Sequence, residues 1–533
     1  MVIHSNAFLS FFQIFNEKRF LLFPRLSVSF SRCVTYVIFT LSLFAVSSSY
    51  AADALPDAGG TPATNSSIVS KKVVDQTVKP DEAQKYALGE FRLKPTIPGF
   101  LRSPYGPPSF GAPYGTTHAF GDWWGAQPWL QKHGIYFAVN IYEGISGNPV
   151  GGKRQSHTLA GQVGSTLDLQ FEKLLNAGEW SRDLWLHMLV VNGNGQNLSR
   201  LMGDNGNQVQ QIYGARGNVV AHLVWAYFEK SMFENRLDVS VGWIPPGTFF
   251  NNSPWVCSFM NVWLCGNVTP GKYLNGGRDW PSGNAGGVVR YMPRPDVYIM
   301  GGAFAVSPHS YNGGISGWSW AQSGISQVST EYEVGWIPEF GRNHLIGHYK
   351  VGGMYDTSRY ERLYEGYTKG TNLGAPTQNF HGRQESIWVM ADQMLLRHGK
   401  GDSNGLVLAG YYNWASGKTS QINNHLVGAI LDTGWYWHRP LDSWGINVQW
   451  ASFSRSAIRA QEAAAAAGQA LPGWNFGAPY GIQGHETIYE AFYTFHVLTG
   501  FNLQPDFQYV NHLGGSTRYK DAAVLSLAMT LAL

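Results

Sequence analysis

Few residues of this sequence have a spacing that suits catalysis. Glu486 and Glu490 are two carboxylates that could serve as acid and base on a glycosidic bond. On one strand, however, they would lie about 13 Å apart at ~3.3 Å per residue. That separation exceeds the roughly 5 to 9.5 Å of glycosidase pairs. No Gly-x-Ser-x-Gly motif, phosphate-binding loop or metal-ligand spacing occurs. The sequence therefore predicts a protein that is not an enzyme and uses no cofactor and no metal.

The two glutamates belong to one of many segments in which apolar and polar residues alternate. In residues 159–173, Leu167 and Leu169 occupy one parity, whereas Thr166 and Asp168 occupy the other. A period of two is typical of a strand with one apolar and one polar face. The same alternation recurs up to the carboxyl end.

We predict about sixteen strands from this alternation. They cover residues 134–145, 159–174, 181–193, 218–232, 235–246, 284–293, 296–307, 327–338, 343–357, 382–398, 404–416, 425–437, 442–454, 485–499, 501–512 and 522–533. Short connections follow the even-numbered strands and long ones follow the odd-numbered strands. This asymmetry indicates an all-β fold, a transmembrane antiparallel β-barrel with short periplasmic turns and long extracellular loops.

The composition agrees with a membrane location. Only 14% of the 533 residues are charged, against roughly 25% in ordinary soluble domains. The 20 Trp and 27 Tyr residues would suit aromatic girdles, although a lectin or propeller could also carry them. No segment after the amino-terminal region reaches the ~18 consecutive apolar residues of a membrane helix, and a closed barrel is the other structure that satisfies its backbone in lipid. The net charge of +3 gives no reason to expect nucleic acid as a partner.

The amino-terminal region resembles an export signal. An apolar run at residues 34–46 follows several basic residues and precedes Ser49-Tyr50-Ala51, so we predict a signal peptide at 1–51. Residues 52–117 are predicted to form a flexible, Pro/Gly-rich periplasmic extension. A short helix at 120–133 opens the barrel domain, 118–533. Export and the barrel pattern together predict that the protein lies in the bacterial cell outer membrane and crosses it many times.

Two of the three cysteines remain after removal of this signal. Cys257 and Cys265 lie in an oxidising compartment and are predicted to form a disulfide. The alternative is two reduced thiols, since no further ligand suggests a zinc site.

Two motifs resemble a known family. Gly121-Asp122-Trp123-Trp124-Gly125 and, near the end, Gln504-Pro505-Asp506-Phe507-Gln508-Tyr509 are similar to the opening and closing motifs of the carbohydrate-selective porins of the OprB type. The resemblance spans about 118–533. It implies an outer-membrane channel that passes monosaccharides, small sugars or polyols by diffusion. The terminal residue, Leu533, departs from the family's aromatic end, which the barrel assembly machinery recognises.

The loop 247–283 is the predicted constriction of such a channel. Sugars combine a C–H face with polar edges, and this loop offers aromatic rings for stacking beside amide and charged groups. Its candidate sugar-binding residues are Asn251, Asn252, Trp255, Asn261, Trp263, Arg278, Asp279 and Trp280. The alternative is an ordinary extracellular loop whose aromatic residues pack on each other or on lipopolysaccharide.

Strand parity places a further set of candidates inside the barrel. These are Arg290, Glu331, Glu333, Glu486, Glu490, Asp506 and Gln508. With Arg290 and Lys350 as counter-charges, they would create a transverse field across the lumen, either as a solvated wall or in direct sugar contact.

The expected partners are sugars or polyols, outer-membrane lipid and lipopolysaccharide, and the barrel assembly machinery. Both a monomer and a homotrimer are compatible with the sequence. Two alternative functions remain: a general porin for small solutes, and a secreted carbohydrate-binding or hydrolytic β-protein.

Overall fold

The computed structural model describes most of the chain from residue 119 onward. The described residues are 119–120, 123–210, 219–233, 236–253, 255–264, 268–274, 276–277, 283–306, 327–369, 381–398, 405–434, 439, 441–474, 477–498 and 500–533. All belong to the compact unit Ser67–Leu533. The predicted signal peptide and extension lie outside this part of the chain.

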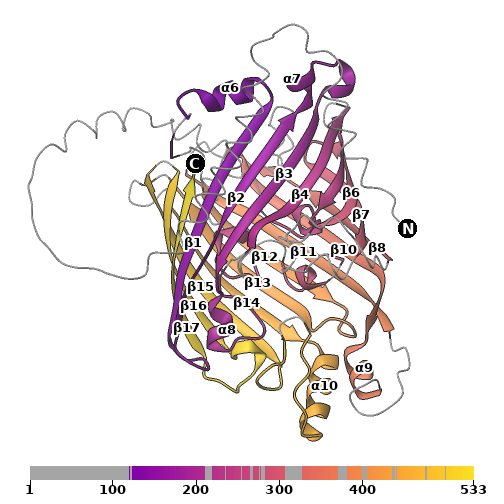
Figure 1. Cartoon of the computed structure of the whole chain (residues 1–533), viewed down its shortest axis with the longest axis vertical. Coiled ribbons are helices and arrows are strands. Elements are labelled where there is room, and N and C mark those ends of the chain that lie inside the picture. Colours follow the sequence, from indigo (N-terminus) through magenta and orange to yellow (C-terminus); the bar gives the residue numbers. More distant parts are fainter. Residues whose placement is uncertain are drawn as a thin grey trace, which may run out of the picture. The chain divides into compact units, whose positions relative to one another are not determined.

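The described strands form one antiparallel sheet (Figure 1). They are β1 (Ile135–Val150), β2 (His157–Gln170), β3 (Leu184–Gly195), β4 (Val219–Met232), β5 (Leu237–Ile244), β6 (Asn284–Arg294), β7 (Val297–Val306), β8 (Gln327–Trp336), β9 (Glu339–Phe340), β10 (Leu345–Glu361), β11 (His381–Arg397), β12 (Gly405–Ala415), β13 (Ile422–Thr433), β14 (Ser443–Phe453), β15 (His485–Leu498), β16 (Phe501–Asn511) and β17 (Ala522–Ala532). The short β9 pairs with β10, and β8 also pairs directly with β10. The other sixteen strands make up the wall and confirm the predicted strand series.

The wall is closed because the last strand pairs with the first. The register between β1 and β17 runs from Asn140 opposite Ala532 to Val150 opposite Ala523, with a shift after Gly147. Closure leaves no unpaired edge, so the backbone polar groups of the wall are satisfied within the sheet. None of the described helices is long and apolar enough to cross a membrane.

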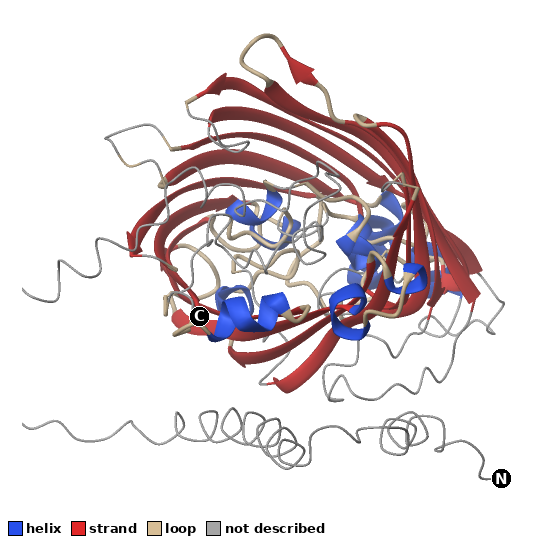
Figure 2. Ribbon diagram, turned by 90° about the horizontal axis from the view of Figure 1, so that it is seen from above, coloured by secondary structure: helices blue, strands red, loops and turns tan. Residues whose placement is uncertain are grey.

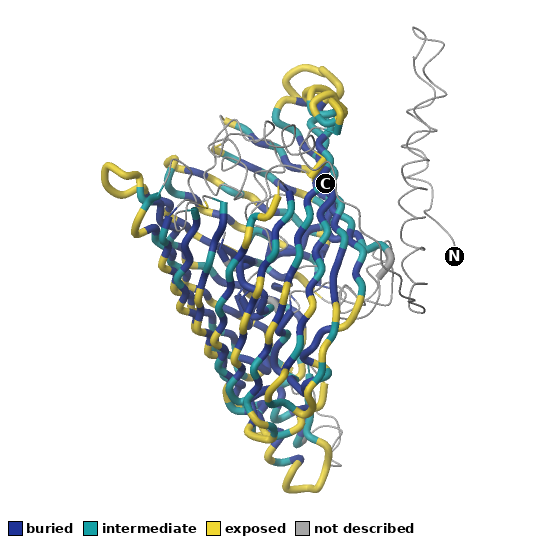
Figure 3. The backbone as a smooth tube through the Cα atoms, turned by 90° about the vertical axis from the view of Figure 1, so that its left-hand side faces the viewer, coloured by how far each residue is buried: buried dark blue, intermediate teal, exposed yellow. Residues whose placement is uncertain are grey.

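Alternation along each strand separates an inner from an outer face. On β11, Trp388 and Met390 point inward and are buried, whereas Val389 between them is exposed. Figure 3 shows this alternation of buried and exposed positions along neighbouring strands. The outer face is rich in exposed apolar residues such as Leu426 and Ile446, which is the surface that lipid favours.

The helices lie at the two ends of the wall (Figure 1). They are α6 (Ala126–Lys132), α7 (Phe171–Leu175), α8 (Leu198–Met202), α9 (Leu363–Lys369) and α10 (Arg455–Ala466). The 3-10 turns η3 (Glu179–Ser181) and η9 (Leu513–Gly515) lie in other connections, and η5 (Pro246–Thr248), η6 (Val256–Ser258) and η7 (Gly271–Tyr273) lie in the connection between β5 and β6. Helices α6 and α7 share the end with the short turns, whereas α8, α9 and α10 share the end with the long loops. The predicted helix at 120–133 therefore exists, in a shorter form.

Several strand ends differ from the prediction by three to five residues, and at the end of β2 the type of element also differs. The alternation suggested a strand over residues 159–174, but β2 ends at Gln170 and Phe171–Leu175 form α7. The neighbouring β1 begins only at Ile135, which pairs with Leu169. Residues beyond Gln170 therefore have no partner on β1. Their backbone groups form hydrogen bonds in a helical turn instead.

Candidate solute pathway in the barrel lumen

The connection between β5 and β6 folds into the barrel. We call residues 247–283 the lumenal loop. Its described residues form hydrogen bonds with inward side chains of β8, β10, β11, β12, β13, β15 and β16. In the view from above, loop segments occupy the space enclosed by the strands (Figure 2). The loop is thus fastened across the lumen to a large part of the wall.

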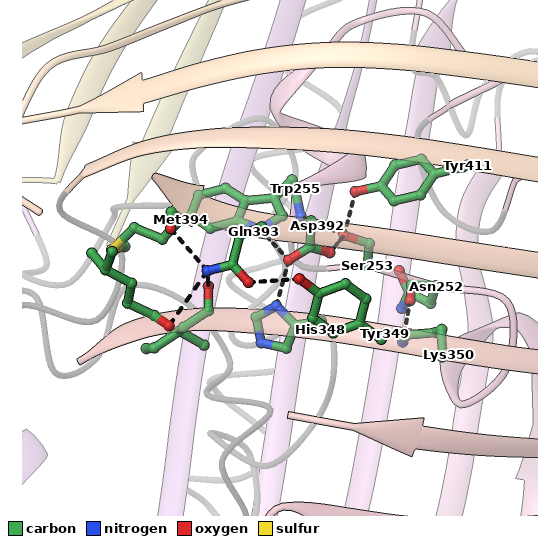
Figure 4. Close-up of polar contacts among 12 residues, drawn as sticks. Asn252, Ser253, Trp255, His348, Tyr349, Lys350, Asp392, Gln393, Met394 and Tyr411 are labelled. Carbon is green, nitrogen blue, oxygen red and sulfur yellow. Dashed lines mark hydrogen bonds and ion pairs between the residues drawn. The ribbon is translucent and has the colours of Figure 1, made fainter. Parts of the chain in front are cut away.

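Asp392 on β11 holds one part of the loop (Figure 4). Its carboxylate accepts hydrogen bonds from the Ser253 hydroxyl at 3.2 Å and from the Trp255 indole N–H at 3.1 Å. His348 of β10 contacts the same carboxylate through Nδ1. The Ser253 hydroxyl also lies 2.8 Å from the Tyr411 hydroxyl of β12. Hydrogen bonds to a carboxylate are stronger than neutral ones, so Asp392 is a principal anchor.

Glu333 on β8 is a second anchor. It accepts a hydrogen bond from the Asn251 backbone N–H at 3.1 Å, while the wall residues Tyr298 and Trp388 donate to it at 2.6 and 2.7 Å. Lys350 lies 3.7 Å from Glu333 and donates to the backbone carbonyl of Asn252 at 2.6 Å. The predicted counter-charge Lys350 therefore neutralises a buried carboxylate and holds the loop at the same time.

Glu490 on β15 is a third anchor. One carboxylate oxygen accepts hydrogen bonds from the backbone N–H groups of Met260 at 2.6 Å and Asn261 at 3.0 Å. The other accepts from the Asn447 amide at 2.8 Å. The Asn261 side chain donates to Gln508 of β16 at 2.9 Å. Two of the predicted inward residues, Glu490 and Gln508, thus bind the loop.

The returning part of the loop is held by an amide and an imidazole side chain. The Asn413 amide of β12 donates to the carbonyl of Val268 at 2.7 Å. The His425 ring of β13 lies 3.1 Å from the carbonyl of Thr269. The loop is closed on itself between Val268 and Asn251, whose backbone groups are joined at 3.2 Å.

A second segment, residues 196–210 after β3, also enters the lumen. Gln508 donates to the carbonyl of Val209 at 2.8 Å, and the Trp263 indole donates to the carbonyl of Gly206 at 2.8 Å. Gln508 and Trp263 therefore join the segment to the wall and to the lumenal loop. This segment was not predicted, and the signal that could have indicated it is a connection between strands that is longer than a turn needs.

Asp204 stabilises a turn in this second segment. Its carboxylate accepts hydrogen bonds from the backbone N–H groups of Gly206 at 2.8 Å and Asn207 at 3.0 Å. Burial raises the pKa of Asp204 to about 7, against the lowering effect of these two hydrogen bonds. Asp204 also interacts electrostatically with Glu486 of β15, so two carboxyl groups meet where the segment approaches the wall.

The residues that strand parity placed on the inner face do lie there. Glu331, Glu333, Glu486, Glu490, Asp506 and Gln508 are all buried on the inner face. Arg290 is also on that face, but it pairs with Asp238 at 2.6 Å. Asp238 on the adjacent strand β5 is directly opposite Arg290 in the register, which explains this pairing.

The two tryptophans predicted to stack on sugar do not present open rings. Trp263 has an exposed fraction of 0% and Trp255 of 4%, and each indole N–H is bonded to protein. In this arrangement both rings hold the loop in place, so their burial does not favour the predicted stacking. Cys265, Arg278, Asp279 and Trp280 lie outside the described residues.

A closed antiparallel barrel with an apolar outer face and loops folded into a polar lumen defines the outer-membrane channels. The chain belongs to the OprB family of carbohydrate-selective porins, whose family model matches residues 154–533. It is accordingly a sugar-selective porin of the bacterial outer membrane.

Individual relatives agree with this assignment. Porin B of Pseudomonas aeruginosa is 25% identical over 416 residues, which cover 76% of this chain and 89% of the relative. The putative porin QuiX of Acinetobacter baylyi is 26% identical over 424 residues, or 77% and 92% of the two chains. The high-pH structure of Pseudomonas putida OprB has a TM-score of 0.69 at 24% identity and covers 78% of this chain and 97% of that one. This last likeness supports the fold.

Proposed function

We propose that small neutral sugars or polyols diffuse passively beside the lumenal loop, and that this loop sets the size of solute admitted. The observation that carries the proposal is the fastening of the loop to three wall carboxylates, Glu333, Asp392 and Glu490. A loop held at several points keeps one shape, and a fixed shape can discriminate between solutes of different size.

Unpaired polar groups beside the loop are the best candidates for solute contact. The Tyr142 hydroxyl, both polar atoms of the Gln162 amide and the Asn140 amide nitrogen have no hydrogen-bond partner among the residues that the structure describes. Tyr142 and Gln162 are directly opposite each other on β1 and β2. Buried polar atoms need partners, and sugar hydroxyls both donate and accept. Met260 of the loop packs against Tyr142, so its side chain must move aside to admit a solute there.

Asn252 is a similar candidate within the loop itself. Its backbone carbonyl is bound by Lys350, but neither polar atom of its side-chain amide has a partner in the described structure. Asn251 and Asn261, in contrast, use their amides to hold Val268 and Gln508. Of the three predicted loop asparagines, Asn252 is therefore the one we propose for sugar contact. For Arg278, Asp279 and Trp280 the predicted contact stays a prediction.

Tyr142→Phe tests the proposed contact. Removing one hydroxyl that binds the sugar should weaken sugar block of the single-channel current by about two- to tenfold, the value of one neutral hydrogen bond. Planar-bilayer recording with glucose titrated into both chambers measures it. Tyr136→Phe is the matched control, because the Tyr136 hydroxyl on the same strand face is already bound by Lys173 at 2.8 Å. Equal block in the parent and Tyr142→Phe proteins would exclude this contact.

A passive channel also accounts for the carboxylates better than an enzyme does. Glu490 accepts three hydrogen bonds from the loop and from Asn447, so it serves as a structural acceptor.

We further propose that Cys265 is the disulfide partner of Cys257. Cys257 is disulfide-bonded, and Cys265 is the other cysteine that remains if the signal peptide is removed. This bond would brace the loop between the Asp392 and Glu490 anchors. Dithiothreitol should therefore increase the current noise of the open channel, whereas a Cys257→Ser/Cys265→Ser variant should be equally noisy with and without it. A parent channel whose current trace is identical in the presence of the reductant would contradict a bracing role.

The signal peptide at 1–51, the extension at 52–117 and recognition by the barrel assembly machinery remain predictions from the sequence. The same holds for the choice between monomer and trimer.

A further inference from the structure

Large aromatic residues are exposed around the end of the barrel that carries the short turns. Trp124 has an exposed fraction of 89%, Trp180 of 58% and Trp129 of 56%, and Phe120 is similarly exposed. They lie in two segments, the described residues 119–120 and 123–133 with α6, and residues 171–182 with α7 and η3. We call these two segments the collar. Water is a poor solvent for so many exposed rings in one region.

The collar continues the outer face of the wall. The Trp123 ring packs edge-on against Phe137 of β1 with centroids 5.8 Å apart, and the Phe171 ring packs against Phe228 of β4 at 6.0 Å. Phe137 and Phe228 alternate with the inward residues Tyr136 and Tyr227 and therefore point outward. The backbone N–H of Ala119 also donates to the carbonyl of Ala532 at 2.7 Å. The collar is thus seated on the lipid-facing side.

The two collar segments are tied to each other. The Lys173 ammonium donates to the carbonyl of Gln131 at 3.4 Å. Gly134, at the end of α6, has a φ of +81°, and a Cβ there would lie 2.7 Å from the carbonyl oxygen of Gln170. Only glycine permits this close approach. The collar therefore has a defined shape in which the tryptophans are held outward.

The backbone around the tryptophan pair is strained. Trp123 and Trp124 both have left-handed φ values, 55° and 56°, which large side chains rarely adopt. Such conformations persist where a function or the surrounding structure requires them. This backbone conformation places the Trp123 ring against Phe137 and leaves the Trp124 ring exposed.

We propose that the collar is an interfacial anchor that binds the phospholipids of the periplasmic leaflet. Trp and Tyr prefer the boundary between acyl chains and headgroups, where one part of the ring system is apolar and the N–H or O–H is hydrated. The exposed Lys132 in the last turn of α6 supplies positive charge for lipid phosphates. Arg182 after η3 is also exposed, but its guanidinium lies 3.8 Å from the Glu179 carboxylate. The short-turn end of such a barrel faces the periplasm, which selects the inner leaflet.

The test measures the depth of a label at Trp124 in proteoliposomes of phosphatidylethanolamine and phosphatidylglycerol. A bimane fluorophore is attached to Trp124→Cys in the full chain, with Ala465→Cys on the exposed side of α10, at the opposite end, as the control. Phospholipids brominated near the headgroup should quench the label at position 124 several-fold more strongly than the label at 465. Iodide in the internal and external buffer should quench the label at position 465 more strongly than the label at position 124.

Two outcomes would overturn the proposal. Equal iodide quenching at positions 124 and 465 would mean that the collar faces water. Protection at 124 from both iodide and brominated lipid, with an oligomeric mass by light scattering, would mean that a second copy covers it. If Trp124→Cys fails to assemble, Trp129→Cys provides the same measurement on α6.

Discussion

Replacing residues 252–267 by two glycines is expected to raise the single-channel conductance several-fold. The hydrogen bonds between Asn251 and Val268 already bring the ends of the deleted stretch together, so a short turn can join them. The deletion removes the groups that bind Asp392 and Glu490 and leaves the pairing of the wall strands in place. Planar-bilayer recording measures the conductance, and heat-modifiable migration on a gel checks that the barrel is intact.

The matched control is a deletion of similar size outside the lumen. Helix α10 packs against α9 in a separate apolar cluster that includes Tyr367, Ala460 and Ala464. Replacing residues 455–466 by a glycine linker should leave the conductance within the scatter of the parent protein. An unchanged conductance in the 252–267 variant, with the barrel intact, would show that the lumenal loop does not limit the pore.

The second large effect is expected from Asp392→Ala. This change removes the acceptor of the Ser253 and Trp255 hydrogen bonds, each worth about 1.5–3 kcal/mol when the acceptor is charged. It also leaves the buried Trp255 N–H unsatisfied. The loop should detach locally, so single-channel traces should show frequent transitions to a larger conductance and sugar block should weaken. Asp392→Asn should show an intermediate effect, since it retains one carbonyl acceptor without the charge.

Asp168→Asn is the control for a general effect of losing an inward carboxylate. Asp168 is buried on β2 and is bound by His187 of β3, and no hydrogen bond from it to the described part of the loop occurs. The single-channel current traces of the Asp168→Asn variant should resemble those of the parent protein. If Asp392→Ala and Asp168→Asn open the channel equally, the effect of Asp392 is not exerted through the loop.

Strand positions could be predicted from the sequence because their signal is local. A side chain's parity in an alternating segment decides its face, so Glu331, Glu486 and Asp506 could be placed inside without knowledge of their neighbours. The end of β2 was missed for a related reason. Whether Phe171 continues the strand depends on where β1 begins, and the sequence of β2 does not contain that information.

The contacts of the lumenal loop could not be predicted, because they join residues distant in sequence. Glu490 binds the backbone of Met260, 230 residues away, and any inward carboxylate would have satisfied the pattern equally. The sequence around Trp255 and Trp263 is the same whether their rings stack on a solute or pack against protein. Only their burial and their indole hydrogen bonds distinguish the two. Asp392 was not among the predicted site residues, because its position fits the alternation less cleanly, and its importance follows from its loop partners.

The most direct test of the central claim, that the lumenal loop sets the size limit for sugars, is liposome swelling with an uncharged series of increasing size. Glycerol, arabinose, glucose, sucrose and raffinose are compared in the parent and in the 252–267 variant. The loop-limited channel predicts a steep fall in rate with solute size for the parent and a much shallower fall for the variant. Parallel size profiles for the two proteins would contradict it.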